Sequence, residues 1–464
     1  MSMGIHEGEQ QEMWVATHDL PKSQGHPFYR KLNKVLAESG FDRLVEDLCE
    51  PYYAKGGRPS VPPGVYFRML LVGYFEGIDS QRGIAWRCAD SLSLKEFLGY
   101  AVTDETPDHS SLTVIRKRLP LEVHHRVFVH VLEIADKKKL LKGKTVATDS
   151  TTLEANAAMK SIVLKETGED WKEYLTRLAK EAGIEDPTDE DLRRFDKKRK
   201  NKKVSNKDWQ SRTDHDSRIA KMKDGRTHLA YKGEHTVDLE TDLILSAEVH
   251  RADRGDPDTL VQAIVGAQLN LMSSGSEAVI RDAAADKGYH RTENLAVLDR
   301  VSVRTYIPEK KLRGRRKWKD IPVEYQQAYY ANRRRVKGKR GRKLQRKRSE
   351  MTERSFAHVC ETGGARRTWL RGLENVNKRY LIQVAARNLG LVMRHMFRVG
   401  TPRSLQGEGM PQFGVFSPDG YVFSALAGVM NSLRRRWAPE LSLAVRLEHF
   451  LVCRTQFRFW AALG

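Results

Sequence analysis

Apolar residues repeat at helical spacing through the first third of the chain. The segment "PFYRKLNKVLAESG" has this spacing and ends at Gly40, and "PPGVYFRMLLVGYFEG" begins with proline and ends at Gly77. Proline at a helix start and glycine just past a helix end are the expected punctuation. The segments "SQRGIAWRCADSLSLKEFLGY" and "DHSSLTVIRKRLPLEVHHRVFVHVLEIADKK" continue the pattern. We therefore predict an all-α domain at residues 27–140, after a flexible lead-in at residues 1–26.

After this region the pattern changes from helical to alternating. The segment "KGKTVATDST" predicts a half-buried strand that ends at Asp149, and "THLAYKGEHTVDLETDLILSAEVH" predicts a hairpin with its turn at residues 240–242. The segment "GDPDTLVQAIVGAQLNLM" predicts a helix capped by Asp256, and "EAVIRDAAAD" predicts a second buried strand that ends at Asp286. The order is therefore strand, hairpin, helix, strand, with an acid at the end of each outer strand.

Two segments are too rich in charge to form a core. Residues 160–212 predict a charged, mainly helical insertion. Residues 310–348 contain 18 Lys or Arg against two acids, which predicts either a solvated loop or a contact with DNA phosphates. We favour DNA contact, while the Trp and Tyr residues of this segment either stack on bases or anchor it to the body. The candidate DNA-binding residues, here and in the helix that follows, are Arg315, Arg316, Lys317, Arg333, Arg334, Arg335, Arg348 and Arg354.

The net charge narrows the class of partner. With 464 residues, 40% of them hydrophobic, the chain is long enough for two or three folded domains. Its net charge of +21 indicates a polyanionic partner, most often nucleic acid, with a merely basic soluble protein or a membrane-surface binder as the alternative. The four cysteines have no metal-ligand spacing, which argues against a zinc module and indicates a reducing compartment. We find no signal sequence or membrane span, so we expect a cytoplasmic protein.

Carboxylates at the ends of adjacent strands suit metal-dependent chemistry at a phosphodiester. Two Mg²⁺ ions about 3.5–4 Å apart assist in-line attack, and hard oxygen ligands hold them. A third carboxylate normally comes from a helix across the same edge, and helical spacing in "SEMTERSFAHVC" places Glu353 beside Phe356, pointing inward. Glu350 lies one turn earlier on the same stripe, so spacing does not choose between them. The alternatives are a turn or cap role for Asp149 and a surface salt bridge for the glutamate.

Several groups of residues resemble a known family. The blocks "VATDSTTLEA", "AADKGYHRTENL" and "SEMTERSFAHVCETGGARRTWLRGLENV" resemble those of the DDE transposases of bacterial insertion sequences. The N-terminal segments "GRPSVPPGVYFRMLLVGYFEGIDSQRGIAWRCADSLSLKEFLGY" and "TPDHSSLTVIRKRL" are similar to the helical domain that precedes the catalytic domain in one branch of that family. The resemblance covers residues 27–397, and residues 398–464 stay unassigned.

The resemblance implies a fold. It implies an α/β RNase H-like catalytic domain, a mixed sheet flanked by helices, at residues 141–397. This domain would carry insertions at about 160–226 and 310–348 and would follow an all-α DNA-binding domain at residues 27–140.

The resemblance also implies an Asp-Asp-Glu triad. Asp149 matches the first acid of the family. Asp286 matches the second, in preference to Asp282, because the Lys-Gly-Tyr of the family block follows it. Glu353 matches the third, in preference to Glu350, because the Arg-x-Phe of the family block follows it.

The sequence departs from the family around the glutamate. Many members carry Tyr and Arg seven and four residues before it and Lys seven residues after it, where this chain has Arg346, Ser349 and Cys360. The usual cationic contacts to the terminal phosphate are therefore missing from their usual places. Either Arg348 or Arg354 substitutes for them, or the element has decayed.

The activity that the resemblance implies is transposition. Such a protein binds the inverted repeats of its element and cuts and joins DNA, with two Mg²⁺ ions, or Mn²⁺ as a substitute, held by the triad. Its partners would be double-stranded element ends and target DNA, and synapsis implies a homodimer, associated with the nucleoid in the bacterial cytoplasm. Two alternatives stay open: a non-catalytic DNA-binding protein derived from an inactivated transposase, and a nuclease of the same fold that cuts without joining.

Overall fold

The N-terminal third of the chain folds into helices around a buried central one. In this computed structural model the described residues are 16, 25–57, 59–200, 204–222, 225–310 and 318–405, so the lead-in and most of the unassigned C-terminal part lie outside them. The helices are α1 (Pro27–Glu38), α2 (Phe41–Cys49), α3 (Pro63–Glu76), α4 (Gln81–Ala89), α5 (Leu92–Leu98), α6 (His109–Arg118) and α7 (Leu121–Lys137), with a 3-10 turn at Glu50–Tyr52. Helix α3 is buried from Gly64 to Phe75 because it is apolar on every side.

Local sequence sets where several of these helices begin. The side chains of Ser80, Ser91 and Asp108 accept hydrogen bonds from the first turns of α4, α5 and α6. Such caps satisfy backbone N–H groups that have no partner inside the helix. The predicted helical region is therefore confirmed.

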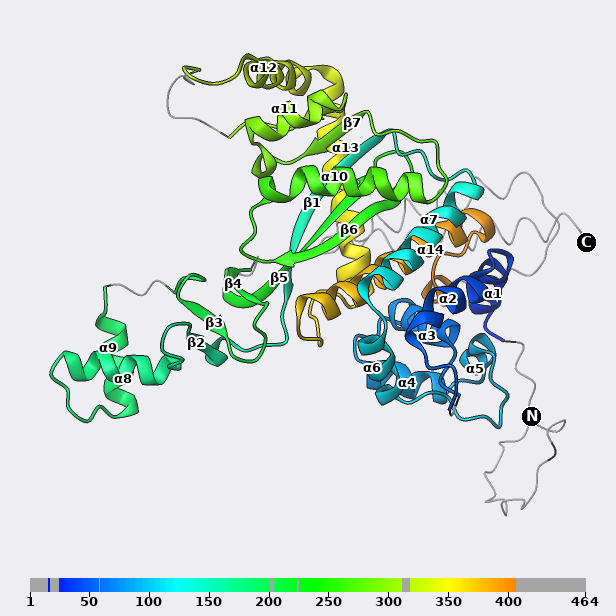
Figure 1. Ribbon diagram of the computed structural model, residues 1–464, viewed down its shortest axis with the longest axis horizontal. Helices are drawn as coiled ribbons and strands as arrows, with labels where there is room; N and C mark the ends of the chain where they lie inside the picture. Colours follow the sequence, from blue (N-terminus) through cyan, green and yellow to red (C-terminus); the bar gives the residue numbers. More distant parts are fainter. Residues whose placement is uncertain are drawn as a thin grey trace, which may run out of the picture. The chain divides into compact units, whose positions relative to one another are not determined.

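A mixed six-stranded sheet follows the helices (Figure 1). Its strands are β1 (Thr145–Glu154), β4 (Arg218–Lys221), β5 (Thr227–Asp238), β6 (Ile244–Arg251), β7 (Asp282–Ala285) and β8 (Arg304–Tyr306). The order is β4-β5-β1-β7-β8, and β6 pairs with the same edge of β5 as β4 does, further along the strand. Strand β1 is antiparallel to β5 but parallel to β7, and β7 is parallel to β8. The predicted hairpin is confirmed as β5 and β6.

Helices cover both faces of this sheet (Figure 1). Helix α10 (Asp256–Ser273) lies on one face, where the hydroxyl of Thr236 donates to the carbonyl of Ala263. Helix α13 (Lys339–Phe356) lies on the other face. The remaining helices are α11 (Thr292–Arg300), α12 (Val323–Lys337) and α14 (Leu373–Phe397), of which α14 packs against β6, α3 and α7. A mixed α/β sheet flanked by helices is therefore confirmed.

Two predicted boundaries are wrong. Strand β1 does not stop at Asp149 but continues to Glu154, because the Thr and Ser residues that follow pair with β5 along its whole length. Helix α10 begins at Asp256 with Gly255 as its N-cap, so Asp256 is the first helical residue and not the cap.

The charged segments contain regular structure. The insertion after β1 holds a two-stranded sheet, β2 (Ile162–Leu164) with β3 (Trp209–Ser211), and helices α8 (Trp171–Glu181) and α9 (Asp189–Lys198). Most of the described part of the basic segment is helical and not a loop, because α12 and the first half of α13 occupy residues 323–348.

The aromatic residues of the basic segment anchor it. Tyr329 is buried and its hydroxyl donates to Glu309 at 2.6 Å. Trp318 and Tyr330 pack against its ring. Two roles were considered for these aromatic residues, stacking on bases and anchoring the segment to the body, and the structure supports the second.

Candidate active site

The first two predicted acids lie side by side where β7 ends. The parallel pairing of β1 with β7 stops at Thr148 opposite Ala285. Asp149 and Asp286 are the next residues along the sequence after these two. Asp286 begins a 3-10 turn, Lys287–Tyr289, in which its Oδ1 accepts from the N–H of Gly288 at 2.7 Å. Asp149 is therefore placed by a continuous strand, and Asp286 by the turn that follows a shorter one.

Asp149 has a partner on each oxygen. The N–H of Ser150 donates to Oδ1 at 2.9 Å, and Nη1 of Arg348 donates to Oδ2 at 2.9 Å. The hydroxyl of Thr352 lies 3.1 Å from the same Oδ2. Burial raises the pKa of the Asp149 carboxyl, and the negative charge of Asp286 acts in the same direction. Arg348, Ser150 and Thr352 oppose that rise in the pKa, because each stabilises the carboxylate.

One stripe of α13 faces the sheet, and it is not the predicted one. The stripe consists of Gln345, Arg348, Thr352 and Ser355, of which Thr352 and Ser355 are fully buried. Glu353 is exposed instead of inward-facing, and its Oε1 accepts from the hydroxyl of Ser349 at 2.9 Å.

The predicted stripe assumed one regular helix through Cys360. The chain leaves α13 at Phe356 and enters a π-helical segment, Ala357–Thr362, so the 3.6-residue spacing does not extend that far. Within α13 itself, Glu353 is one residue of helical rotation, roughly 100°, from the buried Thr352, so the prediction that it points inward is wrong.

The flanks of α13 separate Glu353 from Glu350. Arg354, on one flank, lies 3.7 Å from Asp242. Asp242 is in the turn between β5 and β6, next to the start of β1. At about 100° per residue, Ser349 and Glu353 lie on the opposite flank of α13 from Arg354. Glu350 is exposed on the outer face and pairs with Arg354. Of the two glutamates, Glu350 is engaged by Arg354 and Glu353 by Ser349.

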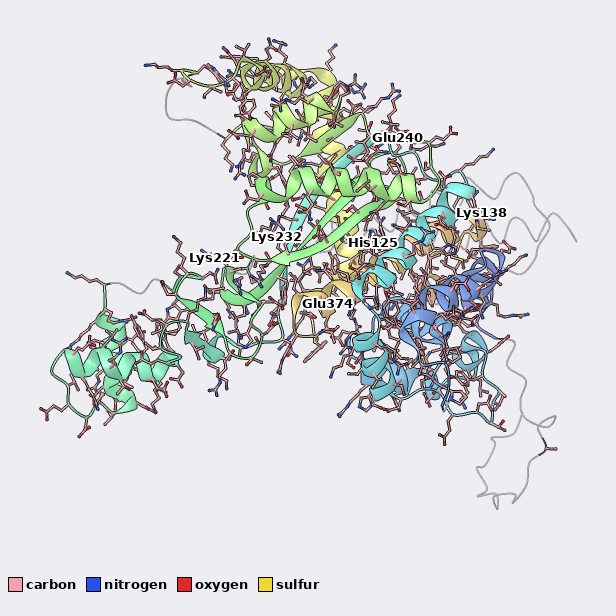
Figure 2. The ribbon with its side chains drawn as sticks, viewed as in Figure 1. His125, Lys138, Lys221, Lys232, Glu240 and Glu374 are labelled. Atoms are coloured by element: carbon pink, nitrogen blue, oxygen red, sulfur yellow. The ribbon has the colours of Figure 1, made fainter. Side chains whose placement is uncertain are left out.

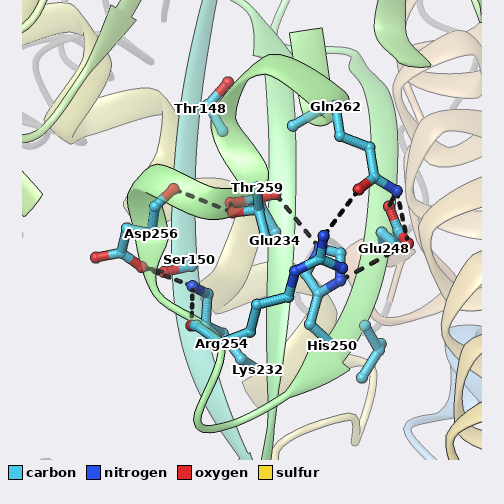
Figure 3. A network of polar contacts seen from close by, with 12 residues as sticks. Thr148, Ser150, Lys232, Glu234, Glu248, His250, Arg254, Asp256, Thr259 and Gln262 are labelled. Atoms are coloured by element: carbon cyan, nitrogen blue, oxygen red, sulfur yellow. Dashed lines mark hydrogen bonds and ion pairs between the residues drawn. The ribbon is translucent and has the colours of Figure 1, made fainter. Parts of the chain in front are cut away.

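A third aspartate, Asp256, which the sequence did not single out as functional, lies near Asp286. Figure 3 shows Asp256 with its partners Lys232 and Ser150. Oδ1 of Asp256 accepts from Nζ of Lys232 at 2.8 Å and from the hydroxyl of Ser150 at 3.1 Å. A Cβ on Gly288 would lie 2.7 Å from Oδ2 of Asp256 and 2.8 Å from Oδ1 of Asp286. Glycine thus leaves room for both carboxylates where a side chain would otherwise lie. Only the "GDPD" segment itself, read as a helix start, pointed to this residue.

A buried glutamate ties α10 and the turn after β7 to the sheet (Figure 3). Oε1 of Glu234 accepts from the hydroxyl of Thr259 at 2.7 Å. It also accepts from the hydroxyl of Tyr289 at 2.8 Å. Its Oε2 lies 3.5 Å from Nε2 of His250. Burial, and then the charge of Glu234, raises the pKa of Tyr289, so the phenol stays protonated and remains a donor. Figure 2 shows Lys232 on the same strand, β5.

A chain of hydrogen bonds fixes α13 over the other face of β5. The fully buried His235, which pairs with Asp149 across the strands, accepts from the hydroxyl of Tyr380 at 2.8 Å. The Ser355 hydroxyl donates to the carbonyl of Thr352 at 2.8 Å, so it must accept from Nδ1–H of His235 at 2.9 Å. In the neutral ring this leaves Nε2 as the acceptor. Burial lowers the pKa of His235, which keeps the ring neutral as this chain of donors requires.

The candidate DNA-binding residues occupy different surroundings. Arg315, Arg316 and Lys317 lie outside the described residues. Arg333 and Arg334 are exposed on α12, and Nε of Arg333 lies 3.3 Å from Glu309.

Three further candidates have partners in the protein. Arg335 donates to the carbonyl of Thr305 at 3.0 Å, and burial lowers its pKa, so this side chain holds α12 on β8. Arg348 is bound to Asp149, and Arg354 is exposed beside Glu350.

The residues fit a divalent cation only after two side chains move. Within the part of the chain that the structure describes, no three His, Cys, Asp or Glu side chains converge closely enough to hold a metal ion as they stand. The donors are of the right chemical kind, because Mg²⁺ prefers carboxylate oxygens and two such groups are neighbours here. Glu353 would have to turn away from Ser349, and Arg348 would have to release Asp149.

The described helices contain none that is long and apolar enough to cross a membrane.

Residues 16–118 match a family model described as a transposase domain (DUF772), and residues 310–393 match one described as a transposase DDE domain. The first match ends with α6 and the second contains Glu353, whereas Asp149 and Asp286 precede it. No curated protein and no solved structure matches the chain.

Proposed function

We propose that this chain, whose two domain matches support an insertion-sequence DDE transposase, cuts and joins DNA through Asp149, Asp286 and Glu353. The observation that carries the proposal is the position of the two aspartates, one residue beyond the last parallel pair of β1 and β7. The position of Glu353 within the residues that match a transposase DDE domain supports its role as the third acid.

The strand order supports an RNase H-like catalytic domain. Three strands form an antiparallel meander, β1, β5 and β6, and two parallel strands, β7 and β8, extend the sheet from β1. The proposed catalytic domain spans residues 141–397, with insertions at about 160–226 and 310–348. The helical region at residues 27–140 is proposed as the DNA-binding domain that precedes it.

Asp149, Asp286 and Glu353 are the residues proposed to hold two Mg²⁺ ions. Bound there, the ions would activate water and stabilise the charge that develops on the phosphate. Asp149 is fixed within β1, whereas Glu353 is exposed on α13 and would have to leave Ser349 to reach an ion. Thr352 of α13 helps to orient the Asp149 carboxylate through its hydroxyl.

The partners proposed are the inverted repeats of the element and the target DNA. The exposed Arg333 and Arg334 of α12, together with Arg315, Arg316 and Lys317, are proposed to contact phosphates. Two DNA ends must be held together for joining, so we propose a homodimer as the active species, acting on DNA in the nucleoid of a bacterial cytoplasm.

The test is a strand-transfer assay on DNA that carries an element end, with Mg²⁺, wild type beside Asp286→Asn. Cleavage and joining by the wild type, both lost in the variant, would support a transposase, and cleavage without joining would support a nuclease of the same fold. DNA binding without either activity in both proteins would refute the catalytic proposal. The engagement of Asp149 by Arg348 is the observation that favours this last outcome, a non-catalytic DNA-binding protein.

A further inference from the structure

Arg348 is held against Asp149 from two directions. Its Nη1 lies 2.9 Å from Oδ2 of Asp149, and only 15% of its side chain is exposed. Its Nε donates to Oε1 of Gln345 at 3.2 Å. The amide of Gln345 in turn donates to the carbonyl oxygens of Ala285 and Tyr306, at the ends of β7 and β8. Gln345, anchored on the ends of β7 and β8, therefore holds the Arg348 guanidinium in place beside the carboxylate.

This contact competes with any dication for the same carboxylate. Oδ1 of Asp149 is occupied by a backbone N–H, and Oδ2 by the guanidinium and the Thr352 hydroxyl. A guanidinium there removes an oxygen lone pair from use and also repels a second positive charge at close range. Within the described residues, Arg348 is the cation that forms an ion pair with Asp149.

We propose that Arg348 is an internal counter-ion that keeps Asp149 from binding the divalent cation until a DNA phosphate draws the guanidinium away. The guanidinium of arginine matches phosphate oxygens as well as it matches a carboxylate, and it binds both in the same planar geometry. Arg348 sits where β7 and β8 end, beside the aspartates at which the scissile phosphate would be cut. The inference rests on the proposed function, because it assumes that Asp149 is a metal ligand.

The proposal makes DNA and metal mutual activators. If DNA removes the competitor from Asp149, then DNA tightens metal binding, and by linkage the metal tightens DNA binding by the same factor. The protein would hold little metal when it is free of DNA. Arg348 would in this way be a positioning residue with two partners, a carboxylate before DNA binds and a phosphate afterwards.

The test measures Mn²⁺ binding to the full chain, without DNA, from the free-ion signal in electron paramagnetic resonance. Arg348→Gln is expected to bind Mn²⁺ about tenfold more tightly than the wild type, within the usual range of such couplings. The matched control is Arg340→Gln, which removes an arginine of the same helix that pairs with the buried Asp282 at the start of β7. This control is expected to leave the Mn²⁺ affinity unchanged.

A second measurement adds a duplex that carries an element end. The duplex should tighten Mn²⁺ binding to the wild type about tenfold and to Arg348→Gln hardly at all. Gln345→Ala, which releases the Nε of Arg348, should raise the DNA-free Mn²⁺ affinity by a smaller factor and serves as the test if Arg348→Gln fails to fold.

Each failure has its own signature. A DNA-free Mn²⁺ affinity of Arg348→Gln equal to or weaker than that of the wild type would overturn the counter-ion role. If Asp149→Asn binds Mn²⁺ as well as the wild type, with and without DNA, the proposed function of Asp149 fails instead.

Discussion

The hydroxyl of Tyr380 offers a sharp test of how the third acid is positioned. Tyr380 is 2% exposed and His235 is fully buried, so their 2.8 Å hydrogen bond has no contact with water. Tyr380→Phe keeps the ring and removes only the donor, which leaves the Nε2 lone pair of His235 without a partner. A buried group left in this state costs about 1–3 kcal/mol. We expect the free energy of unfolding to fall by that amount.

The assay is urea unfolding followed by circular dichroism, with Tyr52→Phe as the control. Tyr52 is 41% exposed, and its substitution should change the free energy of unfolding by less than about 0.5 kcal/mol. A loss for Tyr380→Phe no larger than that of the control would refute the reasoning, since it would mean that the histidine does not depend on this donor.

The same substitution, Tyr380→Phe, should also lower the rate of DNA cleavage. His235 donates to Ser355, two residues after Glu353 on α13, so a loosened histidine loosens the helix that carries the third acid. DNA cleavage by Tyr380→Phe is therefore expected to fall, but by less than in Glu353→Gln. Cleavage by Tyr380→Phe as low as in Glu353→Gln would contradict a purely positioning role.

Three further predictions concern the site and its support. Gly288→Ala places a Cβ 2.8 Å from Oδ1 of Asp286, so cleavage in the strand-transfer assay should fall roughly 10- to 100-fold while the melting temperature changes little; unchanged cleavage would contradict the packing. Arg387→Met removes the buried guanidinium 2.8 Å from the carboxylate of Asp242 and leaves only Arg354, at 3.7 Å, beside it, so the free energy of unfolding should fall by about 3–5 kcal/mol. Adding Asp242→Asn should restore most of this loss, and no recovery would refute the pairing. Because burial lowers the pKa of His235, its contribution to stability is complete above the unfolded value near 6.5 and is lost as the pH falls, by up to about 1.4 kcal/mol per pH unit; urea unfolding at pH 7.5 and 5.5 should show a smaller difference in His235→Gln, and an equal difference would contradict a neutral buried ring.

Periodicity predicted the fold because each element carries its own signal. Alternation in β5 and β6, the proline and glycine around α3, and the buried run before Asp286 are local, and all three appear in the structure where they were expected. The length of β1 was missed because Thr and Ser are as common in strands as in turns.

The site was predictable only as far as it follows the strands. Asp149 and Asp286 were placed by the ends of a parallel pairing, which the strand order implies. The direction of Glu353 was missed because the predicted inward stripe was drawn through Ala357 and Cys360, which lie in a π-helical segment that spacing does not reveal. The engagement of Asp149 by Arg348 depends on which arginine of a crowded helix faces the sheet, and no local pattern decides that.

The long helix α14 has a consequence for anyone who wishes to divide this protein. It is buried from Val376 to Met393 and packs against α3 and α7 as well as against β6. One hydrophobic cluster therefore runs from Phe28 in the first helix to the strands of the sheet. A fragment that stops at residue 140 would present to water the apolar surfaces that α14 covers, and such surfaces associate with one another. Removal of the helical region would expose the side of α14 that packs against α3 and α7 in the same way, so the chain is best expressed whole.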